Sequence, residues 1–211
     1  MRSNGLTVIP KKKFFALIVL GRDQSAHRLS HLTEQIEGQH QIAKCYQLVS
    51  KFCDKVFISA TKEQAADESL AGFPVIYDIN IFEGIGLMGH IISAMSQHPQ
   101  ADWLVVSADF PGLNDALLDD LIAKRNKRKL ATTFRNSTDG YVETLCTIYD
   151  SKCGDYFLQL LKNNQPSLEH FLTEYDVEYI APPEKSLLNV SSSELEKLRK
   201  AKSFITSNKP I

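Results

Sequence analysis

Asp109 is the residue of this sequence whose type and position best suit metal chemistry. It follows residues 103–108, an apolar run typical of a buried strand, and Pro111 restricts the turn that comes next. A carboxylate delivered to the edge of a sheet in this way can hold Mg²⁺ by oxygen ligation, with phosphate oxygens and water at the remaining positions. An Asp that caps a helix or stabilises a loop fits the same pattern equally well.

A glycine cluster suggests a second place for ligand chemistry. Gly84, Gly86 and Gly89 precede a helical pattern of apolar residues. Glycines allow backbone N–H groups to approach a ligand, and the start of a helix favours anions. Asp78 lies just before the cluster and could accept hydrogen bonds from a base or a ribose. A tight turn and a loop-capping Asp explain these residues as well.

The polar segment 21–38 follows the first apolar run and holds Arg22, Ser25 and Arg28. Two arginines there could clamp phosphates, although a solvated loop would have the same composition. The segment contains neither the P-loop pattern nor G-x-G-x-x-G, so the sequence does not support those two nucleotide sites. The six histidines show no zinc-protease spacing, and we expect them at the surface.

Strand and helix patterns alternate along the chain, which predicts an α/β fold with a doubly wound, mostly parallel sheet in three layers. The expected strands are residues 14–20, 55–59, 73–77, 103–108, 130–134, 143–149 and 177–180. The expected helices are residues 41–52, 61–70, a segment opening at the glycine cluster, 115–124 capped by Asn114, 152–162, 168–175 and 192–200. Ligands of such folds bind at the carboxyl ends of the strands, which indicates the loops after Leu20, Tyr77 and Ala108.

Composition limits the classes of function. The chain has 211 residues and a net charge of −1, which fits one domain, at 13–205 behind a flexible leader at 1–12, and argues against nucleic-acid binding. It has no apolar run of the roughly 20 residues that a membrane span needs. Its four cysteines show no C-x-x-C spacing and are expected to be thiols in a reducing cytoplasm. We therefore expect a cytoplasmic protein.

The order of these features resembles the molybdenum cofactor guanylyltransferases, the MobA-like family of nucleotidyltransferases. The family has a glycine-rich first loop, an Asp before a Gly-Pro-Leu-x-Gly turn, a strand that ends in Asp-x-Pro, and an Asn-rich close. Nearly the whole chain follows that order, and the combination is more specific than any single motif. The matching positions are 58–60, Asp78, 87–89, 103–111, 145–149, 167–172 and 188–195.

The resemblance implies a nucleotide-diphospho-sugar-transferase-like (Rossmann-like) fold and transfer of a nucleoside monophosphate from a nucleoside triphosphate. GTP, Mg²⁺ and a phosphorylated acceptor such as molybdopterin would take part, together with cofactor-biosynthesis proteins as partners. Asp109 would hold the metal, Arg28 would act in catalysis and Asn189 would face the acceptor. The nucleotide would be bound by Leu20, Gly21, Arg22, Ser25, Ser59, Asp78, Leu87 and Gly89.

The first loop departs from the family pattern. Leu20-Gly21 stands where the family has Leu-Ala-Gly-Gly, and no lysine occurs between Lys13 and Lys44 to replace the family's phosphate-neutralising lysine. Loss of a donor aimed at developing charge typically costs about 10²–10³ in rate. Two hypotheses follow: an enzyme in which Arg22, Arg28 or a histidine replaces that lysine, or a catalytically impaired homologue that acts as a binding or regulatory protein.

Overall fold

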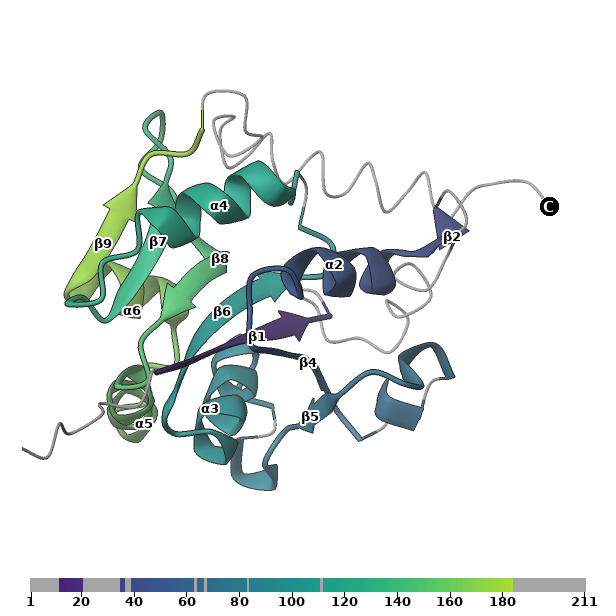
Figure 1. Ribbon diagram of the computed structural model, residues 1–211. Helices are drawn as coiled ribbons and strands as arrows, with labels where there is room; N and C mark the ends of the chain where they lie inside the picture. Colours follow the sequence, from purple (N-terminus) through teal and green to yellow (C-terminus); the bar gives the residue numbers. More distant parts are fainter. Residues whose placement is uncertain are drawn as a thin grey trace, which may run out of the picture.

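The computed structural model describes residues 12–20, 35–36, 39–62, 64–66, 68–82, 84–110 and 112–183, with backbone alone at 35, 36, 39, 40 and 69. Its main feature is a seven-stranded sheet in the order β5-β4-β1-β6-β8-β7-β9 (Figure 1). These strands are β1 (Lys13–Val19), β4 (Lys55–Ala60), β5 (Val75–Tyr77), β6 (Ala101–Ser107), β7 (Ala131–Arg135), β8 (Val142–Tyr149) and β9 (Val177–Ile180). Two short strands, β2 (Gln35–Ile36) and β3 (Gln39–His40), pair separately.

The sheet is mostly parallel, as the alternating pattern predicted. β1 runs parallel to both of its neighbours, β4 and β6. β8 is antiparallel to β6 and to β7, so it alone reverses direction among the strands of this sheet. The expected strands are therefore confirmed, and the sequence pattern did not reveal that β8 runs against the rest.

Helices cover both faces of the sheet, which gives the expected three layers (Figure 1). α2 (Gln41–Val49) and α4 (Asp115–Ala123) lie on one face, and α3 (Leu87–Gln97), α5 (Cys153–Lys162) and α6 (Leu168–Glu174) lie on the other. Asn114 caps α4 as predicted, because its side chain accepts a hydrogen bond from Leu117 N. No helix in the described part of the chain combines the length and the apolar character that crossing a membrane requires.

The prediction of a helix at residues 61–70 was wrong. The chain there forms two short 3₁₀ turns, η2 (Gln64–Ala66) and η3 (Glu68–Leu70), and a third, η4 (Asn80–Phe82), follows β5. The polar segment lacks an apolar face that could hold a longer helix against the sheet. The helix expected at 192–200 lies outside the described residues.

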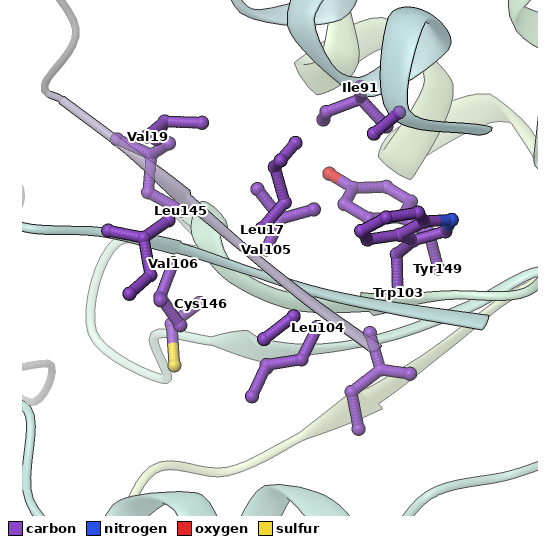
Figure 2. Packing of buried hydrophobic residues seen from close by; sticks show 14 of the residues in the cluster. Leu17, Val19, Ile91, Trp103, Leu104, Val105, Val106, Leu145, Cys146 and Tyr149 are labelled. Atoms are coloured by element: carbon purple, nitrogen blue, oxygen red, sulfur yellow. The ribbon is translucent and has the colours of Figure 1, made fainter. Parts of the chain in front are cut away.

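The core lies on both sides of β1, β6 and β8. Figure 2 shows Trp103 and Tyr149 on the side of the sheet that faces Ile91 of α3. Trp103 and Tyr149 are fully buried, and the Trp103 ring meets Phe15 edge-on at a centroid distance of 5.7 Å. Because β1 and β6 are buried on both faces, they must carry almost continuous apolar runs, and these runs made them easy to recognise in the sequence.

Candidate functional site

The carboxyl ends of β1, β4, β5 and β6 meet at one edge of the sheet. The chain adds β4 and β5 on one side of β1 and then returns to place β6 on the other side. Ligands of open α/β sheets bind where the strand order reverses in this way. Leu20, Ser59, Asp78 and Asp109 lie at or just after the ends of these four strands. The structure therefore brings these four residues to one edge of the sheet, and their predicted roles stay predictions.

The backbone next to Asp109 is held by two neighbouring elements. Ala108 N donates to Val19 O of β1 at 2.9 Å, and Gln41 Nε2 of α2 donates to Ala108 O at 2.9 Å. The hydroxyl of Ser107 donates to Asp109 Oδ1. The half-buried Asp109 carboxylate therefore lies at a fixed position just after β6, and one of its oxygens accepts a hydrogen bond from the neutral Ser107 hydroxyl.

Cys45 lies beneath this edge on α2 and is 5% exposed. Burial, together with the negative charge of Asp109, raises the pKa of the Cys45 thiol to about 12. A thiol in this state is almost entirely protonated near neutral pH and is a poor nucleophile. Cys45 therefore does not provide a nucleophile for the site.

Asp78 and Ser59 are brought together by His90, a residue that sequence reasoning missed. His90 Nδ1 lies 2.7 Å from Asp78 Oδ1 and 2.9 Å from Ser59 Oγ. The prediction that the histidines lie at the surface was wrong here, because His90 is only 6% exposed. Its position three residues after Leu87 in an otherwise apolar helical stretch gave no signal of this contact.

The glycine cluster shapes the start of α3. Gly86 precedes the helix with φ 73°, and Gly84 has φ 78°, a conformation that favours glycine. Gly89 has a packing role, because a Cβ atom there would lie 2.4 Å from the carbonyl oxygen of Phe82. Leu87 is half-buried and packs against the core. The glycine cluster therefore allows α3 to pack closely against the turn that follows Asp78.

Comparison with known proteins identifies the family. Residues 28–179 match the family described as MobA-like NTP transferase domain. The chain belongs to this family. It is 26% identical over 148 residues to a molybdenum cofactor biosynthesis bifunctional protein of Synechocystis, covering 70% of the chain and 42% of that protein. It is 28% identical over 127 residues to a probable molybdenum cofactor guanylyltransferase of Thermococcus kodakarensis, covering 60% of each.

The chain spans less than two thirds of the length of these two curated relatives. A solved structure, molybdopterin-guanine dinucleotide biosynthesis protein A of Archaeoglobus fulgidus, has the same fold, with a TM-score of 0.61 and 18% identity over 94% of the chain and 92% of that protein. The MobA-like family and the Rossmann-like α/β fold expected from the sequence are confirmed.

Several predicted site residues of the chain lie outside the described residues. These are Gly21, Arg22, Ser25 and Arg28 of the first loop and Asn189 near the end of the chain. Leu20 is the last described residue before that loop and is 8% exposed. The roles predicted for these residues remain predictions.

The described residues fit a Mg²⁺ ion that is shared with a substrate. Within them, no group of three or more His, Cys, Asp or Glu side chains could hold a metal ion by itself. Mg²⁺ is commonly held through one or two carboxylates plus substrate phosphates and water. Asp109, half-buried at the edge of the sheet, can supply one such carboxylate.

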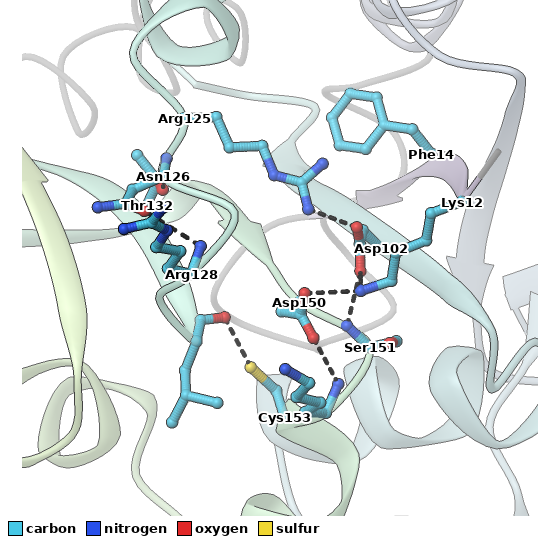
Figure 3. Close-up of polar contacts among 12 residues, drawn as sticks. Lys12, Phe14, Asp102, Arg125, Asn126, Arg128, Thr132, Asp150, Ser151 and Cys153 are labelled. Carbon is cyan, nitrogen blue, oxygen red and sulfur yellow. Dashed lines mark hydrogen bonds and ion pairs between the residues drawn. The ribbon is translucent and has the colours of Figure 1, made fainter. Parts of the chain in front are cut away.

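The opposite edge of the sheet carries an ionic cluster formed by Lys12, Asp102, Arg125 and Asp150 (Figure 3). Lys12 Nζ lies 2.6 Å from Asp102 Oδ1 and 2.6 Å from Asp150 Oδ2, and Arg125 pairs with Asp102. The cluster sits where β1 and β6 begin, at the far end of these strands from Asp109. Its charges are matched with one another, which fits a role in stability. Lys12, assigned to the leader by the sequence, is part of it.

Proposed function

We propose that this protein transfers the nucleoside monophosphate of a nucleoside triphosphate, with GTP as the first candidate, to a phosphorylated acceptor such as molybdopterin, and that it uses Mg²⁺. The observation that carries this proposal is the placement of Asp109 at the strand-order reversal, held by β1, α2 and Ser107. The names of the relatives in Synechocystis and Thermococcus kodakarensis support the acceptor and the guanine base.

The reaction joins an acceptor phosphate oxygen to the α-phosphorus and releases pyrophosphate. Chemistry of this kind depends mainly on positioning and on charge neutralisation. Bound Mg²⁺ would neutralise phosphate charge and orient the oxygens. Asp109 would hold that ion, while Ser59 and Asp78 would face the nucleoside.

The other predicted site residues would bind the remaining parts of the substrates. Leu20, Leu87 and Gly89 would line the nucleotide. Gly21, Arg22, Ser25 and Arg28 would face the triphosphate, with Arg28 acting in catalysis, and Asn189 would face the acceptor. We further propose a cytoplasmic location and contacts with other cofactor-biosynthesis proteins.

A second candidate function is nucleotide binding without efficient turnover. The absence of any lysine between Lys13 and Lys44 favours it, because the family's first loop uses a lysine to neutralise phosphate charge. In that case the protein would bind the nucleotide and metal through the same edge of the sheet and act as a binding or regulatory protein.

Calorimetric titration with GTP, CTP and ATP, with and without Mg²⁺, tests the proposal. Asp109→Asn should weaken Mg²⁺-dependent binding of the preferred nucleotide by about 10- to 100-fold, the range expected for loss of a charge-assisted contact. Asp119→Asn makes the same chemical change at an exposed position of α4 and should bind like the wild type. Absence of binding of all three nucleotides at millimolar concentration would overturn the proposal.

Pyrophosphate release in the presence of molybdopterin then separates the two candidate functions. Turnover that requires Mg²⁺ and falls in Asp109→Asn supports the transferase. Metal-dependent binding without pyrophosphate release supports the impaired homologue.

A further inference from the structure

One nitrogen of His90 holds two side chains that follow different strands. His90 Nδ1 contacts Asp78 Oδ1, just after β5, and Ser59 Oγ, near the end of β4. The side chains of His90 and Asp78 are each 8% exposed, and Ser59 is 2% exposed. All three are therefore removed from bulk water. Hydrogen bonds in such a buried environment hold side chains more firmly than hydrogen bonds in water do.

The chemistry of the three groups fixes the direction of these hydrogen bonds. An ionised carboxylate only accepts, so His90 Nδ1 must carry the proton that Asp78 receives. A protonated Nδ1 has no lone pair for Ser59, so the serine oxygen shares that proton as an acceptor and its own hydroxyl proton points elsewhere. His90 therefore holds one oxygen of Asp78 and the hydroxyl oxygen of Ser59 at a single nitrogen.

Two further side chains of α3 tie down the backbone around Asp78. Ile79 N donates to Ser93 Oγ at 3.0 Å, and Gln97 Nε2 donates to Tyr77 O at 3.3 Å. Positions 90, 93 and 97 lie on one face of a helix, because they are three and four residues apart. They reach three consecutive residues, 77–79, so one stripe of α3 fixes both the side chain and the backbone at the exit of β5.

The backbone of α3 lies close to the η4 turn directly before His90. The close approach of Gly89 to the Phe82 carbonyl leaves no room for a side chain at that point. Gly89 directly precedes His90, so the contact between α3 and the Phe82 carbonyl also determines where the imidazole lies along the helix axis.

We propose that His90 is a positioning residue, which holds Asp78 and Ser59 in a single arrangement for the nucleoside part of a nucleoside triphosphate. Selectivity among nucleotides then depends on a helix buried beneath the site and not only on the loops that contact the ligand. This inference rests on the proposed function, since it assigns these two side chains to the nucleoside.

Two substitutions of His90 separate positioning from simple packing. His90→Asn keeps an N–H group at the position of Nδ1, whereas His90→Leu fills the space without a donor. His98→Leu is the matched control, because His98 lies at the end of the same helix and packs on the rings of Phe15 and Trp103, away from the carboxyl edge. Binding of GTP, CTP and ATP with Mg²⁺ is measured by calorimetry, and melting temperature is measured in parallel.

We expect His90→Leu to weaken binding of the preferred nucleotide by about 10- to 100-fold and to narrow the differences among the three nucleotides. His90→Asn should restore most of the affinity and selectivity. His98→Leu should lower the melting temperature without changing selectivity. Ser93→Ala provides a milder test, in which faster hydrogen exchange at the Ile79 amide should accompany weaker nucleotide binding.

Unchanged selectivity in folded His90→Leu would overturn the inference while leaving the proposed function intact. Equal losses in His90→Asn and His90→Leu would also overturn it, because the shared N–H group would then be irrelevant. Failure of the wild type to bind any of the three nucleotides would overturn the proposed function, and this inference with it. If His90→Leu does not fold, Ser93→Ala still decides. Weaker nucleotide binding with faster hydrogen exchange at the Ile79 amide is expected there, and unchanged binding contradicts the proposal.

Discussion

Replacement of Asp102 by alanine should be the most damaging single substitution in the ionic cluster (Figure 3). The Asp102 side chain is 4% exposed and pairs with Arg125 and Lys12, and it also accepts a hydrogen bond from Ser151 N at 2.8 Å. The Arg125 side chain is only 11% exposed, so removal of Asp102 leaves a buried guanidinium without its carboxylate. Breaking a buried pair in this way costs about 3–5 kcal/mol of unfolding free energy.

Replacement of Lys12 by alanine should cost far less. The Lys12 side chain is 42% exposed, so solvent screens its charge, and exposed ion pairs contribute about 0–1 kcal/mol. Without Lys12, Asp102 keeps its contact with Arg125, and Asp150 keeps the Lys152 N–H at 3.0 Å. The large difference expected between the two substitutions follows from burial, since both remove one member of the same ion pair.

Urea unfolding followed by circular dichroism measures both free energies. For a domain of this size, about 1 kcal/mol corresponds to roughly 2–4 °C, so Asp102→Ala should lower the melting temperature by roughly 6–20 °C. Asp119→Ala, at an exposed position of α4, controls for removal of a carboxylate. If Lys12→Ala proved as destabilising as Asp102→Ala, the reasoning from burial would be refuted.

Three further predictions concern other parts of the molecule. Burial alone would raise the pKa of Asp150, but hydrogen bonds from Lys12 and from a backbone N–H, together with the Lys12 charge, lower it. The unfolding free energy that this contributes is present above about pH 4 and is lost as pH falls through the lowered pKa. Urea titrations should therefore show a steeper loss of unfolding free energy below about pH 4 in the wild type than in Lys12→Ala. Gly89→Ala should cost about 1–3 kcal/mol in urea unfolding, because its Cβ atom would overlap the Phe82 carbonyl, and a neutral result would contradict this packing. Cys45, with its pKa raised to about 12 mainly by burial, should react with maleimide at pH 8 only as the protein unfolds; rapid labelling of the native protein would show that the thiol is accessible.

The central strands could be predicted from sequence because burial on both faces leaves a distinctive pattern. Residues 103–108 contain almost no polar side chains, and β6 is buried at every position. The direction of β8 could not be predicted, because an eight-residue buried strand can have the same composition whether it pairs parallel or antiparallel. Its orientation depends on β7, the strand before it, which reaches the sheet two places away from β6.

The carboxyl edge of the sheet was predictable for a related reason. Once the strands are known, the residues that end them share one edge, so Ser59, Asp78 and Asp109 could be grouped without a structure. His90 and Gln41 could not be found in this way. Each acts at the edge from a helix, and its partner lies 12 or 67 residues away in the chain. Only the packing of α3 and α2 against the sheet makes these contacts.

The two edges of the sheet use carboxylates in opposite ways. Asp102 and Asp150 are buried beside Lys12 and Arg125, so their charges are balanced by the protein itself. In the described part of the chain, Asp109 receives its hydrogen bond from a neutral hydroxyl, that of Ser107, which orients the carboxylate without balancing its charge. A fixed carboxylate whose charge the described residues do not balance favours a cation. The contrast therefore gives a physical reason to place metal chemistry at Asp109 and stability at the ionic cluster.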